Sequence, residues 1–220
     1  MFTINKKIEK YKICDILYTD FASEEVVLLY KQCRTEQSAQ RQRQLEQGLL
    51  LMMLKRQYEE ITVSDLCAET GVPRKAFYRY FSGKDGALFS MIDRALMDFE
   101  IHSTGTELYE PETPMEYMEQ VFVYWTEHQQ LLDALKKSNL SGLLIQRALD
   151  FSRNIDTIPR FMLITDRRLR EYGTMFMVCG LMTMIVQWHE DGFFKSVAEM
   201  AELTMQLLTQ PLFSGNMEDI

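Results

Sequence analysis

Residues 61–93 read ITVSDLCAETGVPRKAFYRYFSGKDGALFSMID. Thr62 followed three residues later by Asp65 is a pattern typical of a capped helix start. Gly71 then supplies the left-handed conformation in which many helices end, and Pro73 suits the first turn of a new helix. The stretch therefore predicts a short helix after Thr62, a turn at Gly71, and a second short helix over Pro73 to Phe81.

Helical patterns continue on both sides of this stretch. Residues 38–57 place Leu45, Leu49 and Met52 at helical spacing. A further helix is expected over 84–101. Three short helices within 45–81, with a glycine in the last turn, indicate a helix-turn-helix unit, which lays its final helix in the DNA major groove.

The final helix of this unit carries side chains that suit DNA. We expect Arg74, Lys75, Tyr78 and Arg79 to face outward, and Tyr80 to be shared between the core and the surface. Arginine can bond guanine edges through two hydrogen bonds, whereas lysine and tyrosine mostly reach phosphates.

The starts of two neighbouring helices offer further phosphate contacts. Lys84 lies at the first turn of the helix over 84–101, and Thr62 and Ser64 lie at the start of the second helix. The unpaired N–H groups at a helix N-terminus favour anions. We therefore expect these positions to hold DNA phosphates.

Composition agrees with a helical globular protein. Of 220 residues, 46% are apolar and 25% charged, and there are only 10 glycines and 5 prolines, which disfavours an all-β fold with many tight turns. Net charge is −8, which alone argues against nucleic acid. The charge is uneven, however, because residues 100–220 hold 9 cations and 18 anions, whereas residues 39–99 are nearly balanced.

Several functional classes lack support in the sequence. No histidine or cysteine spacing suits a metal, and no enzyme motif with a nucleophile–base pair, phosphate loop or paired carboxylates is present. We therefore expect no enzyme activity, metal or cofactor. The chain shows no secretory signal, and its cysteines show no disulfide pattern, which favours the cytoplasm. These cysteines are Cys14, Cys33, Cys67 and Cys179.

A loop with Gly105, Pro111 and Pro114 is the best domain boundary. It divides an N-terminal extension and a DNA-binding domain from a helical C-terminal domain. We assign these to residues 1–38, 39–101 and 102–220. The extension is expected to be partly helical, over about 23–35. The C-terminal domain should hold helices over about 114–128, 129–138, 141–151, 166–190 and 196–209.

The helix over 166–190 is apolar on nearly every face. Such a helix must be buried on every face. Packing against its own subunit on one side and a second subunit on the other would achieve this, and so would a central position in a monomer.

At this level of detail the chain resembles the TetR family of bacterial transcriptional regulators. The similarity covers about residues 39–99, over a quarter of the chain. It is carried by the pairs Thr62-Val63, Asp65-Leu66, Gly71-Val72, Phe77-Tyr78, Tyr80-Phe81 and Lys84-Asp85, in order and at the family's spacing.

The resemblance implies an all-α homodimeric repressor that binds a palindromic operator and is released by a small-molecule inducer. Thr62 would cap the second helix. Carried over by position, the DNA contacts would be Val63, Ser64, Arg74, Lys75, Tyr78, Tyr80 and Lys84.

The C-terminal stretch over 175–208 is similar to the family's last two helices, which form a four-helix bundle across the dimer. The resemblance implies interface positions at Phe176, Gly180, Trp188, Met200 and Leu207. It also implies an effector pocket, for which we select Phe122, Trp125, Phe151, Met175, Cys179 and Met182.

A second interpretation keeps the fold but has the C-terminal domain bind a protein partner instead of a small ligand. The sequence does not name the operator, the effector or the regulated genes, and it leaves repression and activation both open.

Overall fold

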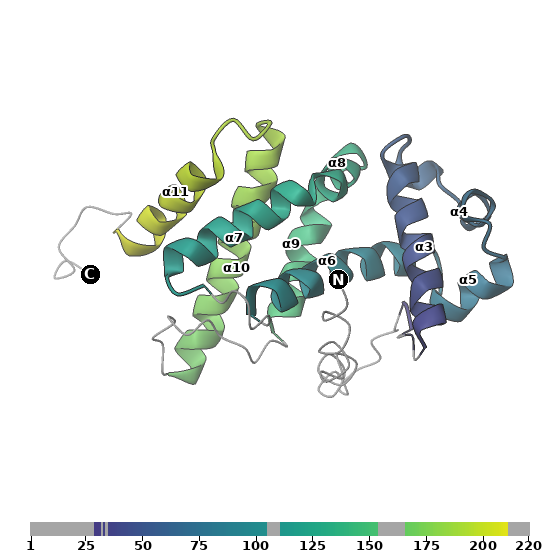
Figure 1. The fold of residues 1–220 in the computed structure, drawn as a ribbon, viewed down its shortest axis with the longest axis horizontal. Coiled ribbons are helices and arrows are strands. Elements are labelled where there is room, and N and C mark those ends of the chain that lie inside the picture. The colour runs from purple at the N-terminus through teal and green to yellow at the C-terminus, as the bar shows by residue number, and fades with distance from the viewer. Residues whose placement is uncertain (1–28, 32, 34, 105–110, 154–165, 211–220) are drawn as a thin grey trace, which may run out of the picture. The chain divides into compact units, whose positions relative to one another are not determined.

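The computed structural model describes residues 29–31, 33, 35–104, 111–153 and 166–210 (Figure 1). These residues are helical, apart from turns and one antiparallel β-bridge between Tyr30 and Phe81. The chain divides into two compact units, Met1–Ile92 and Asp93–Ile220. The division falls within one long helix, whose two parts therefore belong to different units.

The helices of unit 1 follow from short capping signals. Thr35 accepts a hydrogen bond from the Ser38 backbone N–H, and Thr62 and Asp65 cap each other's backbone N–H groups. Gly71 has a φ of 68°, the left-handed conformation that its sequence position predicts. The helices are α3 (Glu36–Met53), α4 (Val63–Thr70), α5 (Arg74–Tyr80) and the start of α6 (Lys84–Thr104), with a 3-10 turn, η1 (Tyr58–Glu60).

The core of unit 1 forms where α3 packs on α4 and α5. Aromatic side chains of the α5 region and aliphatic side chains of α3 and α6 fill it. The largest fully buried side chains here are Phe77, Phe81, Leu45, Leu49, Met53, Ile61, Leu66, Leu88 and Ile92.

A buried polar network joins α3 to α6 inside unit 1. The Gln42 amide donates to Ser90 Oγ at 2.9 Å, and Ser90 Oγ donates to the Glu46 carboxylate at 2.5 Å. The Cys33 thiol donates to Gln42 Oε1 at 2.9 Å. Since buried polar groups are costly without partners, this network fixes how α3 lies on α6.

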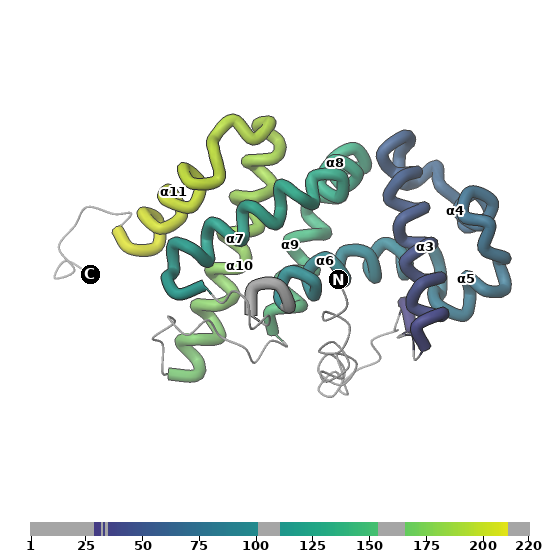
Figure 2. Tube along the Cα trace, in the orientation of Figure 1, coloured from purple at the N-terminus to yellow at the C-terminus, as the bar shows by residue number. Residues whose placement is uncertain are grey.

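Unit 2 is a helical bundle in which α11 packs on α7 and α10 packs on α9 (Figure 2). Its core includes Trp125 and Phe122 of α7, Leu135 of α8 and Ile185 of α10. Besides the end of α6, its helices are α7 (Pro114–Glu127), α8 (Gln129–Lys137), α9 (Ser141–Ser152), α10 (Arg167–Glu190) and α11 (Val197–Thr209).

Two polar contacts hold the second part of α6 within unit 2. The Tyr124 hydroxyl of α7 donates to the Ala95 carbonyl at 2.5 Å. Arg147 of α9 makes two hydrogen bonds to the Asp93 carboxylate, at 2.8 and 2.5 Å. Asp93 is buried, and the bidentate hydrogen bonds from Arg147 offset the cost of burying its carboxylate.

The expected helices match the observed ones within a few residues, with one exception. The helix expected over 23–35 is wrong in its described part, because Tyr30 is extended and pairs with Phe81. Residues 1–28, including Cys14, lie outside the described residues, as do residues 154–165. Cys67 and Cys179 are free thiols, and the Cys33 thiol donates to Gln42 in the network of unit 1.

The Arg147–Asp93 pair yields a stability prediction. Replacing Arg147 with Met keeps most of the side-chain volume but leaves the buried Asp93 carboxylate without this partner. We expect the free energy of unfolding to fall by about 2–3 kcal/mol in urea denaturation. Arg153→Met is the matched control, because the Arg153–Asp150 pair is more exposed and should contribute under about 0.5 kcal/mol. Equal losses from the two substitutions would contradict the assignment.

Candidate nucleic-acid interface

The seven residues of α5 separate cleanly into a buried and an exposed side. Phe77 is fully buried, and its ring lies 5.3 Å from that of Phe81. Tyr78 is 49% exposed, and the three basic side chains of the helix are exposed as well: Arg74, Lys75 and Arg79. The helix therefore exposes three basic side chains and the Tyr78 side chain to solvent, while aromatic side chains form its buried side.

Tyr80 lies differently from the sequence expectation. It is only 7% exposed, and its ring packs 6.3 Å from that of Phe81. Tyr80 lies in the core, because its side chain and that of Phe81 both point away from the exposed side of α5. The structure thus favours a packing role for Tyr80 over a DNA contact.

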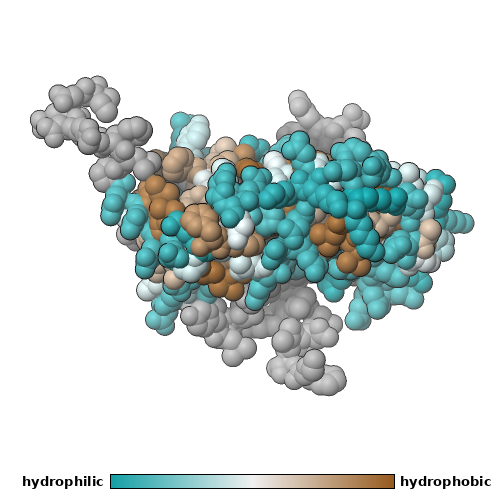
Figure 3. Space-filling model, turned by 90° about the horizontal axis from the view of Figure 1, so that it is seen from above, coloured by the Kyte–Doolittle hydropathy of each residue, from teal (hydrophilic) through white to brown (hydrophobic). Residues whose placement is uncertain are grey.

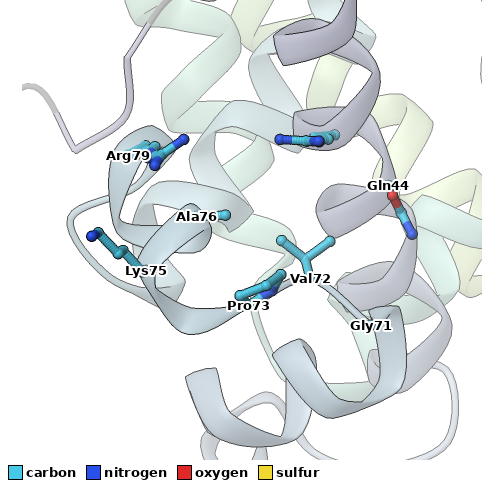
Figure 4. Close-up of a pocket in the computed structure, with 8 residues that line it drawn as sticks. Gln44, Gly71, Val72, Pro73, Lys75, Ala76 and Arg79 are labelled. Carbon is cyan, nitrogen blue, oxygen red and sulfur yellow. The ribbon is translucent and has the colours of Figure 1, made fainter.

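An open groove of about 450 Å³ runs between α5 and α3 (Figure 4). Lys75 and Arg79 lie on one side of it and Gln44 of α3 on the other, with Val72 and Pro73 between them. Arg41 of α3 also lines the groove and adds a third cation. No acidic residue is among the lining residues, so the groove suits an anionic ligand.

Arg41 and Gln44 were not among the expected contact residues. They sit three residues apart and therefore share a face of α3, next to the side chains that α3 buries. From the sequence, that spacing could have indicated that these two side chains lie on one surface of α3. Which cation of α3 would meet α5 depended on how the two helices pack, so nothing in the sequence favours Arg41 over Arg43.

At the start of α4, Thr62 is exposed and its Oγ1 accepts a hydrogen bond from the Asp65 backbone N–H at 3.1 Å. This bond uses the oxygen and leaves the hydroxyl hydrogen able to donate. The Thr62 N–H bond to the carboxylate lowers the pKa of Asp65. Ser64 is exposed and Val63 is half-buried, so both can be reached from solvent.

Lys84 has a different role from the one expected. Its ammonium donates to the carbonyls of Tyr58, Glu59 and Ile61, at 2.7, 3.3 and 3.0 Å. It also lies 4.2 Å from the centre of the Tyr58 ring. Because an ammonium has three donors, these bonds use all of them. Lys84 ties η1 to the start of α6 and is not poised to bind phosphate.

The six residues selected for an effector pocket all lie in unit 2 but in two different environments. Phe122, Trp125 and Met182 are buried in its core, whereas Phe151, Met175 and Cys179 are half-buried. A ring contact at 5.4 Å joins Phe122 to Trp188.

Two of the five expected interface residues are in the subunit core. Trp188 is 3% exposed, packs on Phe122 and Phe193, and donates to the Lys195 carbonyl at 3.0 Å. Met200 is buried as well. Both are core positions of unit 2, because α10 and α11 turn these side chains inward.

The other three expected interface residues face outward. Phe176 is 72% exposed, Leu207 is exposed, and Gly180 adds no bulk beside them. Leu169 and Tyr172 extend the same face of α10 toward its N-terminus. In the space-filling view, hydrophobic surface shows on the side where α11 lies in Figure 1, besides a second, smaller patch (Figure 3). We call Leu169, Tyr172 and Phe176 the α10 face.

The groove gives a prediction that compares two arginines of the same helix. Arg41→Gln should weaken binding to duplex DNA and reduce the slope of log Kobs against log salt by about 0.9, because one phosphate is no longer neutralised. Arg43→Gln removes another exposed cation of α3 that does not line the groove, so it should change neither. Fluorescence anisotropy across a salt series measures both quantities. Equal effects of the two substitutions would show that the groove is not the contact surface.

Comparisons with known proteins agree with this geometry. Residues 52–91 match the family model for bacterial regulatory proteins of the tetR family. This segment spans the end of α3, all of α4 and α5, and the start of α6. A search of curated protein sequences found no match.

Two solved structures share the fold at low sequence identity. A TetR-family transcriptional regulator from Syntrophomonas wolfei matches with a TM-score of 0.56 and 15% identity, covering 81% of this chain and 99% of its own. The fatty acid degradation regulator FadR from Bacillus halodurans matches with a TM-score of 0.52 and 16% identity, covering 82% and 98%. Residues 52–91 thus match the DNA-binding segment of bacterial regulatory proteins of the tetR family, and the chain as a whole shares the all-helical fold of transcriptional regulators of that family.

Proposed function

We propose that this protein is a homodimeric, effector-responsive repressor that binds a palindromic operator. The observation that carries the proposal is the cationic groove between α3 and α5, beside an exposed recognition helix. In the proposed complex, α5 lies in the major groove. Arg74 and Arg79 are the candidates for guanine edges, and Lys75, Tyr78, Arg41 and Thr62 for phosphates.

The α10 face supports the homodimer. Tyr172 and Phe176 are each 72% exposed, and Leu207 and Leu208 of α11 are exposed as well. Such apolar surface on a monomer is a sign of association. A twofold axis would bring the same face of two copies together and present two recognition helices, which a palindromic operator with half-sites one helical turn apart requires.

Unit 2 is the proposed effector-binding unit. Within the described residues, Gln120 of α7 has a buried side-chain oxygen without a hydrogen-bond partner. A buried acceptor left unpaired costs about 1–3 kcal/mol, so a ligand that donates to it would bind with a gain. The apolar candidates around α7, α9 and α10 would supply the rest of such a pocket.

Induction would follow from unequal binding to two forms of the dimer. An effector that prefers the form with its recognition helices misplaced for the operator draws the dimer off DNA. Operator DNA must then weaken effector binding by the same factor.

We place the protein in the cytoplasm, because the operator DNA that it would bind lies there. By length and composition, α10 is apolar enough to cross a membrane, and it is the one such helix among the described residues. The packing of α10 on α9 and the outward α10 face fit a dimer interface equally well, and DNA binding favours that interpretation.

Selection of bound fragments from random-sequence duplex DNA tests the function. We expect enrichment of a palindromic site whose binding weakens steeply with salt, because phosphate contacts release counterions. A single half-site would contradict the dimer. Absence of any enrichment at low salt would contradict operator binding and favour a protein partner for unit 2.

The homodimer makes a separate prediction. Phe176→Glu places a charge on an exposed side chain of the α10 face, so the subunit should fold normally but fail to associate. Light scattering should report a monomer, and operator affinity should fall with it. Val123→Glu, which changes an exposed apolar residue of α7, is the control and should leave the mass unchanged. A dimer in both variants would place the interface elsewhere.

A further inference from the structure

Residues 29–31, which precede α3, are hydrogen-bonded to the end of the recognition helix. The Lys31 N–H donates to the Tyr80 carbonyl at 2.7 Å, and the Ser82 N–H donates to the Leu29 carbonyl at 2.9 Å. Ser82 Oγ donates to the same carbonyl at 3.0 Å. These bonds flank the antiparallel β-bridge. We call residues 29–31 the bridge segment.

The bond to the Tyr80 carbonyl fixes the backbone at the end of α5. The last carbonyls of a helix have no partner within the helix. The bridge segment provides a donor for one of them, in the residue that directly follows Arg79. Arg79 lines the groove and is a candidate for a guanine edge. The bridge segment therefore restrains the backbone from which the Arg79 side chain extends.

The chain just after the bridge segment is bound to α3. The Cys33 thiol donates to Gln42 Oε1 at 2.9 Å, and the Gln42 amide donates to Ser90 Oγ of α6 at 2.9 Å. Cys33 lies only two residues beyond Lys31. One short stretch of chain thus contacts both α3 and the end of α5. It fixes the end of α5 relative to the helix that carries Arg41, the third cation of the groove.

Gly86, in the first turn of α6, allows the bridge segment to lie this close. A Cβ built at Gly86 would overlap the Leu29 carbonyl oxygen and lie 2.9 Å from the carbonyl carbon, and both of these are backbone atoms. Glycine otherwise disfavours a helix relative to alanine. The sequence thus gives up helix stability at a position where only glycine leaves room for the Leu29 carbonyl.

We propose that the bridge segment is a positioning element for DNA reading, because it holds the end of α5 in the orientation from which Arg79 reaches a base edge. The inference rests on the proposed function. Hydrogen bonds to base edges need a defined geometry, whereas a flexible lysine side chain can follow a phosphate when the helix shifts. Loss of the contacts of the bridge segment should therefore lower sequence preference more than it lowers binding to unrelated DNA.

Gly86→Ala in the full-length chain is the first test. The added methyl group meets the Leu29 carbonyl, so the bridge segment has to move, whereas alanine favours α6 itself. The probes are the duplex recovered by the selection and an unrelated mixed-sequence duplex of the same length. We expect the ratio of the two affinities to fall about tenfold, as when one bidentate base contact is lost. The slope of log Kobs against log salt should stay the same, because no charge changes.

Lys31 provides an independent test that leaves α6 untouched. Lys31→Pro removes the N–H that donates to the Tyr80 carbonyl, whereas Lys31→Gln keeps that N–H and removes only the charge. The proline variant should lose preference for the selected duplex, and the glutamine variant should keep it. Gly142→Ala is the control for the glycine substitution, because it lies in the first turn of α9 where a Cβ meets open space. It should change neither affinity.

A purely stabilising role of the bridge segment would give a different result. Urea denaturation measures the free energy of unfolding of each variant. A variant that is only less stable would bind both duplexes more weakly by the same factor, because only the folded fraction binds. An unchanged affinity ratio in Lys31→Pro, or in a folded Gly86→Ala variant, would overturn this inference alone. If the wild-type protein prefers no duplex in the selection, the proposed function fails and this inference fails with it.

Discussion

The DNA-reading unit depends on the burial of Phe77. A helix as short as the seven residues of α5 is not stable alone in water, since its nucleation cost is not repaid over so few residues. The fully buried Phe77, with Phe81 beside it, supplies the missing stabilisation by docking α5 on α3 and α4. The same docking decides which side of α5 remains outside. Lys75 and Arg79 can line a groove with Arg41 because Phe77, which lies between them in the chain, points inward.

The helix α6 is shared by the two units and so connects the DNA-binding unit to unit 2. Its first turn is held in unit 1 by the Lys84 ammonium on η1, and its middle is held there by the network of Gln42, Ser90 and Glu46. Its later part is held in unit 2 by Arg147 on Asp93 and by the Tyr124 hydroxyl on the Ala95 carbonyl. In the proposed repressor, an effector-dependent change in unit 2 would have one continuous helix through which to act.

Most helices could be predicted because their signals are local. Thr62 with Asp65, Gly71, and Ser196 with Glu199 mark helix ends through contacts that span only a few residues. The split of α5 into aromatic and basic sides was likewise readable from helical spacing. Two of the predicted site residues lie differently because of tertiary packing. Tyr80 is turned into the core, and Lys84 is bound by carbonyls more than 20 residues away.

The fold class, the order of the helices and the helix-turn-helix unit follow from the amino-acid sequence alone, because capping and hydrophobic periodicity act within a single helix. Tertiary packing was needed to settle which polar side chains share a surface. It placed Arg41 in the groove, turned Trp188 into the core of unit 2, and paired Tyr30 with Phe81 at the end of α5. Each of these outcomes depends on how one helix packs against another, and packing joins residues whose separation in the chain carries no periodic signal.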